Sequence, residues 1–142
     1  MQVDFYHLAR SPIERVLPAI SEKVLQAGGR LLVVAGEDQL ARLDEQLWTY
    51  APDSFLPHGR DKEADQPILL AAEPEARNGA ANIAIADGKW RDEALGFERA
   101  FYFFDSGALD EAREAWRALS RKEGVEPRYW KQDDKGRWVQ GP

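Results

Sequence analysis

The segment at residues 30–35, RLLVVA, limits what this chain can fold into more than any other. It is almost continuously apolar, and such a run is typical of a strand that is buried on both faces of a sheet. An amphipathic helix is expected directly after it, over residues 37–48, with an apolar stripe of Leu40, Leu43, Leu47 and Trp48. A buried strand that leads into such a helix predicts a parallel sheet covered by helices.

Four further segments are expected to be strands: residues 3–8 (VDFYHL), 66–71 (QPILLA), 82–86 (NIAIA) and 100–104 (AFYFF). One helix is expected over residues 109–121. Another should start after Ser11, with Ser11 as the N-cap, Pro12 at the first helical position and Glu14 completing a capping box. Because no helical segment separates the strands between residues 66 and 86, the sheet is expected to be mixed.

These patterns predict a single α/β domain over residues 1–142, with a mostly parallel central sheet flanked by helices. From about residue 126 an extended C-terminal tail is expected, with a hairpin around residues 133–136. The chain contains no cysteine, which excludes a thiol nucleophile and a thiolate metal site. Since it shows neither a signal-peptide pattern nor an apolar run of the ~18–20 residues that a membrane span needs, a soluble cytoplasmic protein is expected.

The net charge of −6 is unevenly distributed along the chain. Residues 1–112 hold 11 Lys and Arg against 20 Asp and Glu, a balance of −9, whereas residues 113–142 hold 8 against 5, a balance of +3. The acidic bulk would repel a nucleic-acid backbone, and the basic C-terminal part could attract a local acidic ligand. A solvated helix end and a charged tail would give the same asymmetry.

An enzymatic site finds little support in the sequence. A Rossmann-like fold binds nucleotides through a glycine-rich turn at a helix N-terminus, but here the turn reads AGEDQ, and Glu37 and Asp38 would repel a phosphate. His7 and His58 are far apart and have no metal-ligand spacing around them. The sequence therefore predicts no catalytic residue, no cofactor and no metal, and His58 as a general base is the remaining enzymatic alternative.

Two segments look better suited to protein contacts. The first holds Trp48, Phe55, Pro57 and His58 within eleven residues, and aromatic side chains are enriched at the centres of interfaces. The alternative is that Trp48 and Phe55 only close the edge of the core beneath a loop.

The second segment is the helix expected to end near residue 121. Arg113, Trp116 and Arg117 stand at i, i+3 and i+4, so they share one helix face, while Ala112, Ala115 and Leu119 can meet the sheet. Two arginines beside a tryptophan suit a short acidic peptide with an apolar end. The alternative is that the arginine stems simply cover a core tryptophan.

Taken together, these segments resemble the chi subunit of bacterial DNA polymerase III holoenzyme. The similarity runs nearly from end to end. It is carried by FYHL at residues 5–8, GGRLLVV at 28–34, RLDEQLWTYAPDSFLPH at 42–58, AREAWRALSRKEG at 112–124 and RYWKQDDKGRW at 128–138. The third of these matches the most specific motif of the family, RLDExLW…SFxPH.

The resemblance implies a non-catalytic accessory subunit of a DNA-directed DNA polymerase. Chi links the psi subunit of the clamp loader to the acidic C-terminal tail of single-stranded DNA-binding protein, which ends in Pro-Phe. By this resemblance Arg113, Trp116 and Arg117 bind the tail. Trp48 and Phe55 face psi, with Pro57 and His58 supporting that loop, and contact with DNA is only indirect.

One departure and two rival functions accompany this interpretation. Leu109 stands where some family members carry a basic residue, and Arg121, Lys122 and Arg128 are candidates to replace that charge. One rival is a small-molecule enzyme that uses His58. The other is an adaptor for a helicase-like repair partner, which would use the surface around Trp48 and Phe55 and ignore the tail.

Overall fold

The computed structural model describes residues 1–49 and 57–141, so the predicted role of Phe55 lies outside the described residues. The helices are α1 (Ile13–Gln26), α2 (Glu37–Thr49) and α3 (Leu109–Ser120). The strands are β1 (Gln2–His7), β2 (Leu31–Val34), β3 (His58–Gly59), β4 (Ile68–Ala71), β5 (Asn82–Ile85), β6 (Arg99–Phe104), β7 (Glu126–Gln132) and β8 (Trp138–Gln140). Short 3₁₀ helices lie at Glu63–Asp65, Asp92–Gly96 and Ser106–Ala108.

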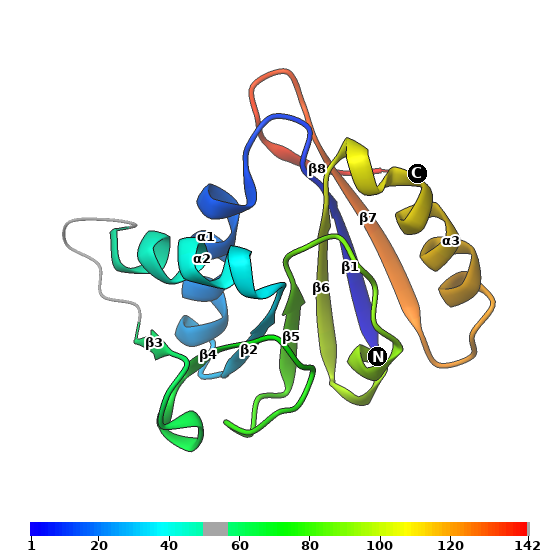
Figure 1. Cartoon of the computed structure of the whole chain (residues 1–142). Helices are drawn as coiled ribbons and strands as arrows, with labels where there is room; N and C mark the ends of the chain where they lie inside the picture. The colour runs from blue at the N-terminus through cyan, green and yellow to red at the C-terminus, as the bar shows by residue number, and fades with distance from the viewer. Residues whose placement is uncertain (50–56, 142) are drawn as a thin grey trace.

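The described strands form one eight-stranded sheet in the order β3-β4-β2-β5-β6-β1-β7-β8 (Figure 1). Strand β1 lies inside the sheet, parallel to β6 on one side and to β7 on the other. Phe5 is therefore in register with Tyr102 of β6 and with Tyr129 of β7. The predicted α/β domain with a mostly parallel sheet is confirmed.

The sheet is mixed, but not where the sequence suggested. The strands β4 and β5, between residues 66 and 86, both run parallel to β2, which lies between them. The antiparallel pair is β7 with β8, which confirms the hairpin around residues 133–136. Asp133 stabilises its turn by accepting hydrogen bonds from the backbone N–H groups of Lys135 and Arg137, both at 2.9 Å.

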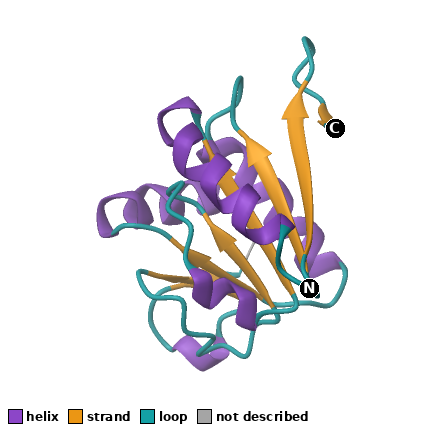
Figure 2. Ribbon diagram, turned by 90° about the vertical axis from the view of Figure 1, so that its right-hand side faces the viewer, coloured by secondary structure: helices purple, strands orange, loops and turns teal. Residues whose placement is uncertain are grey.

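The two faces of the sheet carry separate layers. Helices α1 and α2 cover one face and pack on Tyr6, Val33 and Phe103, whereas α3 covers the other face and packs on Phe5 and Phe104 (Figures 1 and 2). Successive residues of a strand point to opposite faces, so the short apolar strands supply both layers. This is why β2 is buried along its whole length.

Helix α1 begins one residue later than predicted, and its N-cap differs. Pro12 is the N-cap residue and makes no side-chain capping bond, so the proposed box of Ser11 and Glu14 is wrong. The Ser11 hydroxyl instead accepts a hydrogen bond from Gln132 Nε2 at 3.0 Å. Gln132 Oε1 in turn accepts from the backbone N–H groups of Arg10 and Ser11. The Ser11 hydroxyl therefore bonds to Gln132 at the end of β7 and does not cap the helix.

One carboxylate, Asp4, is completely buried in the middle of the sheet. It accepts hydrogen bonds from Arg99 Nε at 3.0 Å, from Trp130 Nε1 at 3.1 Å and from Gln2 Nε2 at 3.0 Å. Arg99 also lies over the ring of Phe101, with 4.5 Å between the guanidinium carbon and the ring centroid. This network ties β6, β1 and β7 together beneath the α1 face.

Candidate functional site

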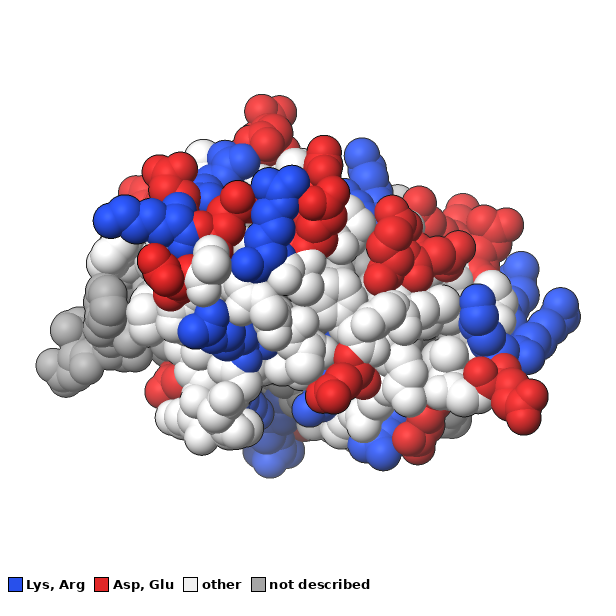
Figure 3. Space-filling view, turned by 90° about the horizontal axis from the view of Figure 1, so that it is seen from below, with Lys and Arg blue, Asp and Glu red and all other residues white. Residues whose placement is uncertain are grey.

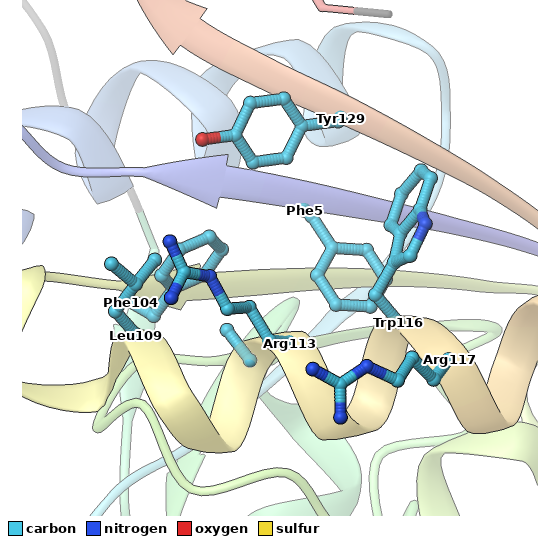
Figure 4. Close-up of a pocket in the computed structure, with 8 residues that line it drawn as sticks. Phe5, Phe104, Leu109, Arg113, Trp116, Arg117 and Tyr129 are labelled. Atoms are coloured by element: carbon cyan, nitrogen blue, oxygen red, sulfur yellow. The ribbon is translucent and has the colours of Figure 1, made fainter.

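A groove of about 310 Å³ lies between α3 and the strands β1, β6 and β7 (Figure 4). Its lining combines aromatic, aliphatic and cationic side chains, namely Phe5, Phe104, Leu109, Ala112, Arg113, Trp116, Arg117 and Tyr129. The groove therefore contains the three residues that the sequence singled out on this helix. Its other walls come from strands that are distant from α3 in the sequence.

The floor of the groove is a cluster of aromatic side chains that contact one another. Trp116 meets Phe5 edge to face, with ring centroids 5.1 Å apart, and meets Tyr129 in the same manner at 6.2 Å. Edge-to-face contacts of this kind favour one orientation of each ring. Trp116 is half-buried, so it both packs on the sheet and leaves part of its ring to the groove.

Helix α3 presents this surface because of its apolar spacing. Ala112, Ala115 and Leu119 are buried against the sheet, as the sequence predicted. Residues 113 and 117 follow one and two positions after such contacts, so their side chains emerge at the edge of the helix and are exposed.

The lining of the groove contains two arginines and no Asp or Glu. Neither Arg113 nor Arg117 forms an ion pair with any described residue. Figure 4 shows Arg113 reaching toward the end of the groove where the Tyr129 hydroxyl lies, whereas the side chain of Arg117 runs alongside the helix in the direction of Arg113. Burial raises the pKa of the Tyr129 phenol, and the nearby charge of Arg113 partly opposes that rise. An unpaired guanidinium beside an apolar pit is a suitable receptor for a carboxylate.

Sequence reasoning missed Phe5, Phe104 and Tyr129 as parts of this groove. Each is on a strand, and only the pairing of β1 with β6 and β7 brings the three together. Tyr129 falls in the segment expected to be a tail, where nothing in the sequence signals a wall of a site.

The candidates to replace a cation at Leu109 are not in the groove. Arg121 and Lys122 are absent from its described lining. Arg128 precedes Tyr129 on β7, so it points to the opposite face of the sheet, and it pairs with Glu126 at 3.4 Å. Arg113 and Arg117 therefore supply the charge of this site.

The second predicted surface lies at the end of α2. Trp48 is 55% exposed and its ring centroid lies 4.7 Å from that of His58. The His58 side chain is itself fully covered, and its Nε2 atom lies 3.0 Å from Asp44 Oδ1 and 3.1 Å from the Asp44 carbonyl oxygen. Pro57 is half-buried beside it. The Trp48 ring is thus exposed on one side and contacts the buried ring of His58.

The covered position of His58 argues against a role as general base. Such a base must reach the proton that it removes, and the whole His58 side chain is shielded here. Among residues 1–49 and 57–141, no group of three or more His, Asp or Glu side chains is placed to hold a metal ion. Within the same residues no helix is long and apolar enough to cross a membrane.

The fold and the groove define a class of protein, namely an α/β domain with an arginine-lined groove, and its sequence contains no glycine-rich phosphate-binding motif. The model of the family described as DNA polymerase III chi subunit, HolC, matches residues 1–128, and the chain belongs to this family. Its members are accessory subunits of DNA polymerase III, which acts in DNA replication. A comparison with curated proteins found no match.

Proposed function

We propose that this chain is a non-catalytic bridging subunit of the clamp-loader complex. The groove with Arg113, Trp116 and Arg117 binds the acidic C-terminal tail of single-stranded DNA-binding protein. The surface around Trp48, Phe55, Pro57 and His58 binds the psi subunit. The observation that carries the proposal is a pair of arginines beside an aromatic pit, neither of which forms an ion pair within residues 1–49 and 57–141, in a family of polymerase III accessory subunits.

The chemistry of the groove favours a short peptide. Its volume of about 310 Å³ is near the lower end of the range for ligand pockets, so it admits one or two side chains rather than a helix. The aromatic floor suits an apolar terminal residue, and the arginines suit the carboxylates that precede or end it. An acidic tail ending in Pro-Phe has both features.

The positions of the two surfaces favour bridging. The groove lies on the α3 face of the sheet, whereas Trp48 lies in the last turn of α2, in the layer on the opposite face (Figure 1). One ligand therefore does not block the other. Both surfaces come from one domain, so a partner on each would be held at a fixed separation.

Contact with DNA is proposed to be indirect. The phosphate backbone dominates DNA affinity, and a protein that follows it needs a basic track. This chain has a net charge of −6, and Figure 3 shows acidic and basic side chains interspersed on the face seen from below. The tail contact itself should be micromolar, because it is small and orders a disordered ligand. Several tails on one coated strand would raise the apparent affinity by avidity.

Fluorescence anisotropy of a labelled tail peptide tests this function. Wild type is compared with Arg113→Ala and Trp116→Ala, and Trp48→Ala is the matched control because it removes an exposed aromatic side chain far from the groove. Each groove variant should weaken binding about five- to 150-fold, the equivalent of ~1–3 kcal/mol. Added salt should weaken the wild-type complex as well. Absence of saturable binding at low salt would refute the tail-receptor function.

An adaptor for a helicase-like partner is the second candidate, favoured by the 55% exposure of Trp48. The same variants separate it from the bridging role. Trp48→Ala should abolish capture of psi and leave tail binding unchanged. If purified psi binds wild type and Trp48→Ala equally well, the surface belongs to another partner.

A further inference from the structure

The wall of the groove opposite α3 is formed by Tyr129, one residue beyond the segment that matches the family model. The Tyr129 hydroxyl lies 3.1 Å from Nδ1 of His7, at the end of β1. Figure 4 shows that hydroxyl pointing toward the part of the groove that holds Arg113. No second hydrogen bond to this hydroxyl is present within the described residues.

His7 is held in a fixed orientation beneath Tyr129. Its ring stacks on Phe104, with centroids 5.2 Å apart and planes 11° from parallel. Its other nitrogen, Nε2, is buried and has no hydrogen-bond partner among the described residues. The two nitrogens of His7 therefore differ in their hydrogen bonding. Nδ1 lies within hydrogen-bond distance of the Tyr129 hydroxyl, whereas Nε2 has no partner among the described residues.

This difference selects the tautomer of neutral His7. If the proton were on Nε2, a buried N–H group would lack an acceptor, and buried donors of that kind are rarer than under-satisfied acceptors. The proton is therefore assigned to Nδ1, which donates to the oxygen of Tyr129. Because that oxygen accepts from His7, the hydroxyl proton of Tyr129 is available to a ligand in the groove.

We propose that Tyr129 is a carboxylate-binding residue of this groove and that His7 is its positioning residue. The inference deepens the proposed function and rests on it. Tyr129 donates a hydrogen bond to the same carboxylate that Arg113 binds, so the two oxygens of this carboxylate lie between β7 and α3. Arg113 attracts the carboxylate by its charge, and the Tyr129 hydroxyl fixes its orientation.

The carboxylate in question is the C-terminal one of the peptide. In this proposal the terminal aromatic side chain of the peptide packs on Phe5, Phe104 and Trp116, which line the groove. The α-carboxylate belongs to that same residue, so it must lie at the rim of the pit, where Arg113 and the Tyr129 hydroxyl are. A side-chain carboxylate of the preceding residues starts at least one residue, about 3.5 Å, farther along the peptide.

Two tail peptides, one with a free and one with an amidated C-terminus, distinguish carboxylate binding by Tyr129 from simple packing of its ring. Tyr129→Phe keeps the ring that packs on Trp116 and removes only the hydroxyl. It should weaken binding of the free-acid peptide about tenfold, as expected for a hydrogen bond to a charged group at a partly exposed site. It should leave binding of the amidated peptide unchanged. Equal losses for both peptides, or no loss for either, would overturn the proposal.

Two variants of His7 test its positioning role. His7→Phe keeps the stacking on Phe104 but removes the donor, so the preference for the free acid over the amide should fall severalfold. His7→Asn places an amide N–H near the position of Nδ1 and should restore much of that preference. The measured quantity is the ratio of the affinities for the free-acid and the amidated peptide. If this ratio is the same in His7→Phe and in wild type, His7 does not position Tyr129, whatever the stability of the variants.

The tautomer can be measured without any ligand. The ¹⁵N chemical shifts of His7 at neutral pH should show a protonated Nδ1 and an unprotonated Nε2, and the reverse pattern would overturn the inference. If wild type binds neither peptide, the proposed function and this inference both fall. If Arg113→Ala loses the free-acid peptide but Tyr129→Phe does not, the function stands and this inference alone is refuted.

Discussion

Replacing the buried carboxylate of Asp4 should destabilise the domain more than any single exposed charge does. Asp4→Asn keeps the size of the side chain but removes its charge and converts one acceptor into a donor. That amide then faces Arg99, Trp130 and Gln2, all of which donate to Asp4 in the native protein. At least one of these three donors loses its acceptor.

The size of the effect follows from the partners. Breaking one half of a buried ion pair typically costs 3–5 kcal/mol, and a hydrogen bond to a charged group contributes about 1.5–3 kcal/mol. Arg99 is 43% exposed, so water can partly replace its lost partner. We therefore expect a loss of about 3 kcal/mol in the free energy of unfolding, or roughly 10 °C in Tm for a domain of this size.

Urea denaturation at pH 7, followed by circular dichroism, measures this loss as a lower midpoint at an unchanged slope. Glu126→Gln is the matched control, since it removes the same charge from the exposed pair with Arg128 and should cost less than about 1 kcal/mol. Adding Arg99→Met to Asp4→Asn should recover part of the lost free energy of unfolding, because the Arg99 charge that has lost its partner is then removed as well. A loss below about 1 kcal/mol for Asp4→Asn, or one equal to that of the control, would refute the reasoning.

Two further predictions concern a glycine and a tyrosine. Gly88→Ala should cost about 2 kcal/mol in urea denaturation, because Gly88 has φ +75° and a Cβ there would lie 2.9 Å from Ala108 Cβ. Gly79→Ala, at φ +71° with open space around it, should cost less, and equal losses would contradict a steric origin. Burial, assisted by the charge of Asp4, raises the pKa of Tyr6 to about 12. The folded state thus holds this proton more tightly, so its stabilising effect is present below pH 10 and is lost as the pH rises to 12. Wild type should lose free energy of unfolding between pH 7 and pH 11, and Tyr6→Phe should lose about 1 kcal/mol less over the same interval. Melting curves at the two pH values measure this difference. Equal losses in the two proteins would show that Tyr6 does not cause the pH dependence.

The strands with continuous apolar runs could be predicted from the sequence, but their neighbours could not. Residues 31–34 and 100–104 are apolar throughout because they are buried on both faces. The sequence of β7, EPRYWKQ, has no such run because every residue in it stays at least partly exposed, so its pattern predicts a tail rather than a strand inside the sheet. Its place beside β1 depends on pairing across more than a hundred residues, for which a single sequence gives no signal.

The same distinction applies to the candidate site. Arg113, Trp116 and Arg117 could be grouped because helical spacing alone places them on one face. Phe5, Phe104 and Tyr129 could not be added to them, since each comes from a different strand. The misplaced N-cap at Ser11 has a similar cause, because its hydroxyl is bound by Gln132, which lies at the end of β7.

The interior position of β1 has a consequence for how the domain acquires its structure. The partners of β1 begin at residues 99 and 126, so a chain emerging from the ribosome carries β1 unpaired until most of its length has been made. Such long-range pairing slows folding, because the entropy of a large loop must be lost before the pairing gains any contacts. The groove is assembled from β1, β6, α3 and β7, so it forms at the last of these events. A chain can therefore present the groove only after residues up to Tyr129 have been made and β7 has paired with β1.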